Sequence, residues 1–448
     1  MVWQTIFPFI FIFSLVDGFI SRLLYPAKLP LLYRDIFILV VYFLFASQEH
    51  VGRWINKLQK KIGNAAWLLA MSFLFIGMLQ IFNPSSPGLL LGLLGFKLYF
   101  LYWPLAILAF AYVDDMEKVK RVIQAVVYAS APINLFGLYQ FSQGPEYMIA
   151  TFGEGYKGNV MVAHIQDPTY HDESFLRILG TFGSSGQFSN FLVVNVMFCF
   201  ALLFMASTPR QRWLLYGCQA LNFLALLGTG SRGALVTIIL QLFVFSILCR
   251  RARPVAGAAV IASFFLYLGF SWLGRDVVKR YESLRQIEEL RKRALDATGL
   301  MFLEAFEKYP LGEGLGSASG AARHLKGQEG TTWQLVENYP SKVQLETGII
   351  GVILFYLFLV MLMIRWFKRW IYWYRFLDSK TFDLSIALTA YCFAQFAFVS
   401  IFGSLDSPPA SVFLWAVLGM SARISSWGEE REMEGWHQDQ EPEVSRVS

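Results

Sequence analysis

The chain alternates between long apolar runs and short polar connections. About twelve runs reach roughly 20 residues, the length that an α-helix needs to cross the hydrocarbon core of a bilayer. They lie near residues 4–22, 30–48, 64–83, 88–113, 121–142, 186–206, 212–229, 232–250, 254–273, 341–364, 382–402 and 408–424. The pattern predicts an all-α integral membrane protein with about twelve transmembrane helices. The first run lacks the basic region of a cleaved signal peptide, so we expect it to be retained.

Basic residues decide the predicted orientation of these spans. They gather in alternate connections, at residues 53–61, 118–121, 210–212, 250–253 and 365–380. Cytoplasmic loops carry an excess of Lys and Arg, so these connections and both termini are expected on the cytoplasmic side. The long loops at about 144–184 and 274–340 then face outward, and the second begins with a charged, helix-prone stretch. The interpretation is a polytopic membrane domain over 1–426 and a disordered, acidic cytoplasmic tail over 427–448.

Composition supports the membrane assignment and excludes several other classes. Hydrophobic residues make up 56% of the chain and charged residues 16%, which is too apolar for a soluble protein of this length. The net charge of +6 follows from the loop pattern, and we expect no nucleic-acid partner. The four cysteines fall in or beside spans and are interpreted as packing residues. His164, His171 and His324 are scattered without ligand spacing, so neither a metal nor another cofactor is expected.

A short break between two apolar runs is the first candidate site. It reads Gly228-Thr229-Gly230-Ser231-Arg232 and predicts a tight turn with Ser231 and Arg232 at the start of the next helix. A helix N-terminus offers unpaired N–H groups and a partial positive charge, and an arginine there strengthens the attraction for an anion such as pyrophosphate. The alternative for Arg232 is an interfacial anchor whose guanidinium reaches the lipid headgroups.

The second candidate site is Glu337-Asn338, where the long outer loop returns to the membrane. A partly desolvated carboxylate has a raised pKa, which suits a general base. Glu337 could equally be an acidic residue that favours the start of a helix dipole. The residues alone do not separate these two interpretations.

Further basic residues of the outer loops are candidates for binding phosphate. Arg177 precedes a glycine-rich stretch that leads into the span at 186–206. Arg291 and Arg293 lie in the charged stretch of the second loop, and one of them could turn toward the site. For most charges of that stretch, ion pairs within a solvated helix are the simpler explanation.

Lys97 lies inside an apolar run. A lysine in a span is energetically unfavourable and usually has a partner. Asp17 and Asp406 are the candidate partners in the sequence.

Several of these motifs together resemble the bacterial O-antigen ligase and O-antigen polymerase superfamily. They are Ser231-Arg232-Gly233-Ala234, the stretch from Arg177 to Gly183, Tyr309-Pro310-Leu311-Gly312-Glu313-Gly314-Leu315-Gly316, Glu337-Asn338 and Gly348-Ile349-Ile350-Gly351. The resemblance covers roughly residues 175–365. Ligases of the family carry a histidine at the position of Glu337, so the similarity is to polymerase-like members that make exopolysaccharide.

The resemblance implies a GT-C-like membrane glycosyltransferase of the bacterial cytoplasmic membrane with its active site on the extracytoplasmic face. Such an enzyme takes a glycan from undecaprenyl pyrophosphate and passes it to an acceptor, here another lipid-linked repeat unit. Glu337 and Arg232 would be catalytic. Arg293 or Arg291, Arg177, Asn338, Ser231 and Lys97 would bind pyrophosphate or glycan. Flippase and chain-length regulator proteins are candidate partners.

Two alternative functions are carried forward. The first is an O-antigen ligase that transfers the glycan to lipid A core or to protein. The second is a transporter or flippase of an anionic lipid-linked glycan, which would use the same arginines and no base. Transporters usually contain repeats and broken helices at mid-membrane, whereas the polar motifs here gather near one face.

Overall fold

The structure is a computed structural model that describes residues 1–24, 32–86, 88–153, 162–164, 174–249, 301–318, 338–399, 405 and 408–440, together with a few residues between 260 and 271. Long helices dominate the described residues. Seven of them are long and apolar enough to cross a membrane, and the bent pair α3–α4 adds an eighth if it counts as one span. The protein is therefore an α-helical membrane protein.

Between residues 1 and 112, the described part of the chain contains seven α-helices. They are α1 (Val2–Ile6), α2 (Phe9–Leu23), α3 (Tyr33–Gln48), α4 (Val51–Ile62), α5 (Asn64–Ile81), α6 (Leu89–Phe100) and α7 (Leu105–Tyr112). The chain bends by 105° between α3 and α4. α4 carries its lysines on one side and buries Leu58 and Ile62 on the other, which is the pattern of a helix lying at an interface.

Between residues 116 and 249, the described part of the chain contains four α-helices and a small hairpin. They are α8 (Met116–Phe152), β1 (Val162–His164), β2 (Ser174–Leu176), α9 (Ser185–Met205), α10 (Pro209–Gly228) and α11 (Arg232–Cys249). α8 is interrupted at Gly144, whose φ of 78° is not helical. The two strands pair antiparallel, with Ala163 opposite Phe175.

The last third contains α15 (Met301–Lys308), α17 (Tyr339–Arg365), the π-helical turn η6 (Trp366–Trp370), α18 (Ile371–Trp373), the 3₁₀ turn η7 (Tyr374–Phe376), α19 (Ser379–Ala394), the π-helical turn η8 (Gln395–Val399) and α21 (Ala410–Gln440). α17 contains a break at Gly348. The predicted tail begins at residue 427, but α21 instead continues as a helix through Gln440. Residues 441–448 lie outside the described residues.

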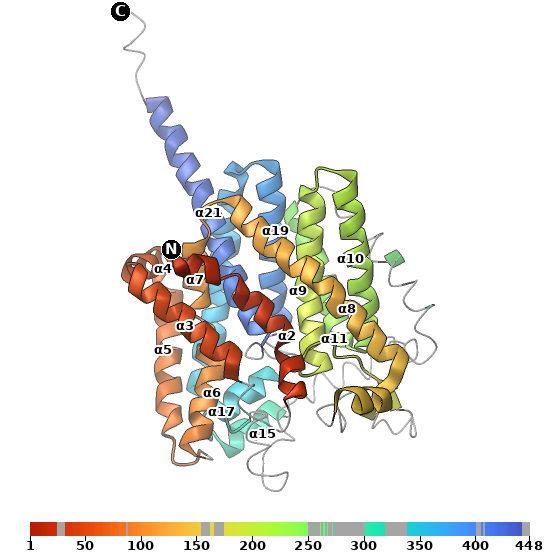
Figure 1. Cartoon of the computed structure of the whole chain (residues 1–448). Coiled ribbons are helices and arrows are strands. Elements are labelled where there is room, and N and C mark those ends of the chain that lie inside the picture. The colour runs from red at the N-terminus through yellow and green to blue at the C-terminus, as the bar shows by residue number, and fades with distance from the viewer. Residues whose placement is uncertain are drawn as a thin grey trace, which may run out of the picture.

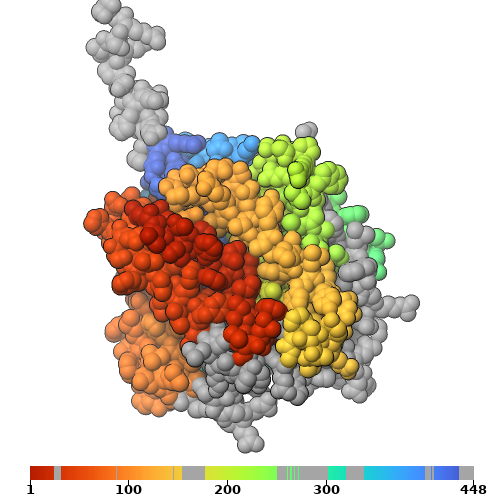
Figure 2. All heavy atoms as spheres, in the orientation of Figure 1, coloured from red at the N-terminus to blue at the C-terminus, as the bar shows by residue number. Residues whose placement is uncertain are grey.

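The helices pack as two groups joined by α19. α17 packs against α5 and α21 against α7, whereas α8, α9 and α10 contact one another and α19 contacts α9, α11 and α21. Figure 1 shows both groups running between the same two ends of the bundle. On the face shown in Figure 2, the N-terminal helices lie beside α8.

The two ends of the bundle differ in the residues that they contain, and they are called the basic end and the glycine end. The basic end contains α4, the C-terminal part of α17 with η6, and α21 beyond Arg423 (Figure 1). Arg365 donates to the carbonyls of Lys60 and Lys61 there, so two basic connections placed on one side by the sequence do meet. The glycine end contains the α5–α6 connection, residues 177–184, the α10–α11 turn and residues 309–318.

Interior polar residues join α8, α9 and α10. Asn195 donates to Ser130 (2.8 Å) and to Asn222 (2.7 Å), and Asn134 also donates to Asn222 (2.7 Å). All four side chains are buried. Hydrogen bonds between side chains hold membrane helices together where lipid gives no hydrophobic drive for their association. The surface of the bundle, in contrast to this polar interior, carries large apolar side chains. Examples are Phe43 (73% exposed), Leu68 (67%) and Phe243 (60%), as expected for a surface in contact with lipid.

Seven of the predicted spans coincide with helices that can cross a membrane, at residues 64–83, 88–113, 121–142, 186–206, 232–250, 341–364 and 382–402. The span predicted at 30–48 corresponds to the first half of the bent pair. α2 has only 15 residues, and α10 and α21 are not among the helices that satisfy the length and hydropathy requirements. The span predicted at 254–273 lies almost entirely outside the described residues. The total of twelve therefore remains a prediction.

Candidate functional site

The turn between α10 and α11 has the tight geometry that its sequence predicts. Thr229 is fully buried, donates to the carbonyl of Leu226 (2.6 Å) and accepts from the amide of Ser231 (3.2 Å). Gly230 has a φ of 63°, a conformation that favours glycine, and this lets the chain reverse within a few residues. Arg232 is the first residue of α11, and both Ser231 and Arg232 are partly exposed. The turn therefore places an arginine at a helix N-terminus.

Arg177 lies directly on this turn. Its Nε donates to the carbonyl of Thr229 (2.8 Å), and the amide of Ile178 donates to the carbonyl of Gly228 (3.1 Å). Arg177 and Arg232 are 55 positions apart in the sequence, so only the tertiary structure brings their backbones to the same turn. Arg177 as a whole residue is partly exposed.

Two other helices hold the segment that carries Arg177. Gln140 of α8, which is fully buried, donates to the carbonyl of Gly180 (2.9 Å) and accepts from the amides of Leu179 (3.1 Å) and Gly180 (2.9 Å). Arg22 of α2 donates to the carbonyl of Gly183 (2.6 Å). The sequence analysis identified neither side chain as part of the site. The signal in the sequence for Gln140 was its position as a polar residue near the end of a long apolar run.

The glycine-rich motif at 309–316 packs tightly against two helices. Gly316 has a φ of 83°, and a Cβ there would lie 2.1 Å from the carbonyl oxygen of Leu91 in α6. On the other side, the amide of Glu313 donates to the carbonyl of Leu345, and the amide of Ile349 donates to the carbonyl of Pro310 (3.0 Å). The break in α17 at Gly348 thus accommodates this motif.

Asn338 begins α17 as its N-cap. Its side-chain oxygen accepts from the amide of Ser341 (2.8 Å), and the residue is buried. Nearby, the fully buried Glu346 accepts from the amide of Ala318 (3.1 Å). The ammonium of Lys342 lies 5.3 Å from the ring centre of Tyr99. The start of α17 is consequently polar and closely packed.

Lys97 has the partner that its position requires, and among the described residues it is not the predicted Asp17. Its ammonium binds Asp35 (2.6 Å), which also accepts from Tyr102 (2.8 Å) and from Arg34. Arg34 in turn pairs with Asp17. Asp17 therefore belongs to the same network and is linked to Lys97 through Arg34 and Asp35. Asp406 lies outside the described residues.

These contacts form two groups. Arg177 and the turn before Arg232 form one, whereas Asn338 caps α17 and Lys97 of α6 binds Asp35. Glu337, Arg291 and Arg293 lie outside the described residues, so their predicted roles stay predictions. Within the described part of the chain, no three His, Cys, Asp or Glu residues are grouped as a metal would require.

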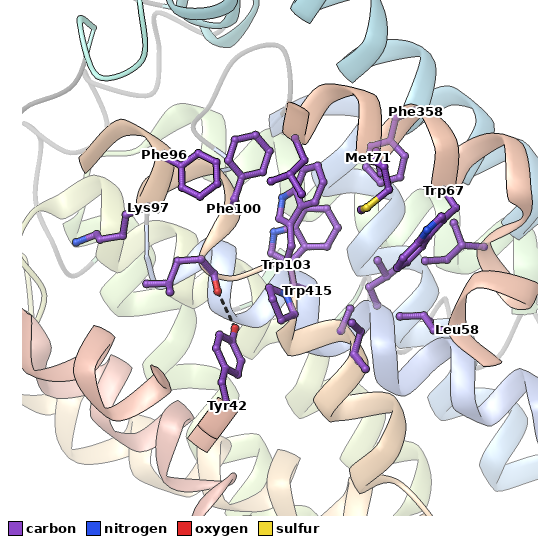
Figure 3. Close-up of a pocket in the computed structure, with 18 of the residues that line it drawn as sticks. Tyr42, Leu58, Trp67, Met71, Phe96, Lys97, Phe100, Trp103, Phe358 and Trp415 are labelled. Carbon is purple, nitrogen blue, oxygen red and sulfur yellow. Dashed lines mark hydrogen bonds between the residues drawn. The ribbon is translucent and has the colours of Figure 1, made fainter. Parts of the chain in front are cut away.

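A separate apolar cavity of about 500 Å³ lies among α3–α7, with α17 and α21 completing its wall. Trp103, Phe100 and Trp415 line its centre, and Lys97 lies at its edge with the ammonium pointing away from the aromatic rings (Figure 3). Its lining includes no residue of α9, α10 or α11, so it is distinct from the arginine turn.

Comparisons with known proteins do not assign the chain to a family: no family model matches it, and no curated protein matches it.

Proposed function

We propose that this protein transfers a lipid-linked oligosaccharide from undecaprenyl pyrophosphate, acting as a polymerase of repeat units for a surface or exported polysaccharide. The observation that carries the proposal is the hydrogen bond from Arg177 to the Thr229 carbonyl. It brings a second arginine to the turn where Arg232 begins α11. Two arginines at one helix N-terminus are suited to a pyrophosphate, because guanidinium groups match phosphate geometry and the helix end adds N–H donors.

The proposed chemistry needs charge stabilisation more than acid catalysis. Pyrophosphate leaves as a stable anion, so positive groups that match its developing charge are the main requirement. Arg232 and the N-terminus of α11 would supply them, with Arg177 and one of Arg291 and Arg293 assisting. Glu337 would accept the proton of the attacking sugar hydroxyl. Direct displacement would invert the anomeric centre, and no metal is required. Ser231 and Asn338 would contact the substrate near these groups.

In the proposed arrangement the glycine end faces outward across a bacterial cytoplasmic membrane. This follows from the basic connections, which meet at the opposite end of the bundle and would be cytoplasmic. The substrates are a lipid-linked donor and a lipid-linked acceptor, both held in the membrane.

Glycan transfer in liposomes tests the proposal. Purified protein receives lipid-linked repeat units alone, and the products are separated on a gel. We expect a ladder of lengthening chains. Arg232→Ala should reduce transfer about 100- to 1,000-fold. Arg210→Ala is the matched control, because this exposed arginine lies at the opposite end of α10.

The remaining outcomes distinguish the alternatives. Transfer only after a core lipid or a protein is added would identify a ligase. Movement of the lipid-linked glycan across the membrane without a new glycosidic bond would identify a transporter. Activity of Arg232→Ala equal to that of Arg210→Ala would remove Arg232 from the mechanism.

A further inference from the structure

The basic end contains a second cavity, of about 320 Å³, far from the arginine turn. Helix α4, the end of α17 with η6, and α21 supply most of its lining. Six basic side chains line it: Lys57, Lys60, Lys61, Arg365, Arg369 and Arg423. Among the described residues, the carboxylates that line it are Glu429 and Glu430. The cavity is therefore strongly positive, although it is assembled from three segments far apart in the sequence.

Some of these basic groups already have structural partners. Lys61 pairs with Glu429, and Arg423 pairs with Glu430 (3.2 Å). Arg365 donates to two backbone carbonyls of α4, each at 2.7 Å. These contacts fix the walls of the cavity and use both of its carboxylates.

Lys60 and Arg369 lack the partners that Lys61, Arg365 and Arg423 have among the described residues. Neither makes an ion pair with any residue that the structure describes, and both are exposed where they border the cavity. Lys57 lies over the ring of Trp54, with its ammonium 5.0 Å from the ring centre. Two cations on facing walls, α4 and η6, are consequently available for an anion in the cavity.

The position of the cavity along its helices favours a lipid over a free anion. On α17, Phe358 lines the apolar cavity and Arg365 lines the basic one, about 10 Å further along the helix. On α21, Leu418 and Arg423 follow the same order, about 8 Å apart. The partly exposed Trp373 lies among the basic groups, as such rings do at the headgroup level of a membrane.

We propose that this basic cavity binds the phosphodiester headgroup of an anionic membrane lipid. Lys60 and Arg369 would contact the phosphate from opposite walls, and the acyl chains would extend toward the apolar side chains nearer the middle of the bundle. Basic pockets between membrane helices recognise anionic headgroups in this way. The proposal does not depend on glycosyl transfer.

Lipid binding by the purified full-length protein tests whether the basic cavity recognises an anionic headgroup. Native mass spectrometry in a neutral detergent compares phosphatidylglycerol with phosphatidylcholine, which has the same chains and no net charge. We expect preferential binding of phosphatidylglycerol. Lys60→Gln and Arg369→Gln should each weaken it about fivefold, from the effect of one basic residue on an anionic lipid. Arg53→Gln is the matched control, because it removes one charge from α4 at an exposed position outside the cavity.

Three results would overturn the proposal. Equal binding of phosphatidylcholine would show that the headgroup is not recognised. Equal losses in Lys60→Gln, Arg369→Gln and Arg53→Gln would indicate general electrostatic attraction and no site. Complete displacement of phosphatidylglycerol by millimolar inorganic phosphate would identify a free-anion site. Thermal melting of each variant verifies that it remains folded.

Discussion

The two ends of the bundle are built by different means. At the basic end, long charged side chains join separate helices, as Arg365 does with α4 and Lys61 does with Glu429. At the glycine end, backbone lies against backbone, and neutral amide side chains such as Gln140 bind the chain. Among the described residues, ten glycines have positive φ, and only Gly63 belongs to the basic end.

This difference has a physical consequence for function. Charged side chains at a boundary can rearrange and are screened by salt, whereas close backbone contacts allow little movement. A site that must hold a leaving group in a fixed position is better placed at the rigid glycine end. Binding of exchangeable lipid suits the charged end.

Loss of the interior ion network should have the largest effect. Asp35→Asn leaves the buried Arg34 and the half-buried Lys97 without their shared carboxylate, and breaking a buried pair such as Arg34–Asp35 typically destabilises by about 3–5 kcal/mol. The thermal midpoint of the purified protein measures the change. Asp114→Asn removes an exposed carboxylate paired with Lys118 and should cost less than about 1 kcal/mol. Similar midpoints for the two variants would show that the network contributes little.

Gly316→Ala should break the close packing of the glycine end. The new Cβ would lie 2.1 Å from backbone, and the alanine would have to adopt a positive φ. We therefore expect the free energy of unfolding to fall by roughly 3 kcal/mol. Gly233→Ala is the control, because a Cβ there meets nothing within 4 Å and the residue is helical. That variant should be neutral or slightly more stable. A normal melting curve for Gly316→Ala would contradict the packing described here.

Gln140→Ala should loosen the segment that carries Arg177. It removes one donor and an oxygen that accepts from two buried amides, with an expected loss of about 2 kcal/mol. Faster hydrogen exchange at residues 178–183 is the direct measurement. Gln143→Ala, at an exposed position one turn further along α8, should leave that exchange unchanged. If Arg177 acts at the turn, glycan transfer should fall in Gln140→Ala as well.

Glu429→Gln should have the smallest effect. Its carboxylate pairs with Lys61 at a partly exposed position, and such pairs contribute less than about 1 kcal/mol. The loss should shrink further at high salt, because mobile ions screen the wild-type pair. Thermal melts at low and high ionic strength measure this, with Gly316→Ala as the reference that salt should not change. A large loss that persists in salt would mean that the basic end is as rigid as the glycine end.

Local patterns were sufficient for seven of the predicted spans and for the tight turn before Arg232. A run of about 20 apolar residues has few alternatives in a membrane, since every backbone group must be bonded within its own helix. The cost of placing a charge inside a span predicts that Lys97 needs a partner, but it does not predict which residue that partner is. Asp35 was overlooked because it precedes an apolar run and resembles an ordinary acidic residue of a first helical turn.

The sequence by itself determined that the protein is helical, that it belongs in a membrane, and that arginine and glycine motifs flank its spans. Only the tertiary structure decided that Arg177 reaches the Thr229 carbonyl, that Gln140 holds its segment, and that six basic residues of three helices enclose one cavity. The reason is that hydropathy and turn chemistry act over a few residues. Which helices become neighbours depends on the fit of whole surfaces, and that fit is not encoded in any short motif.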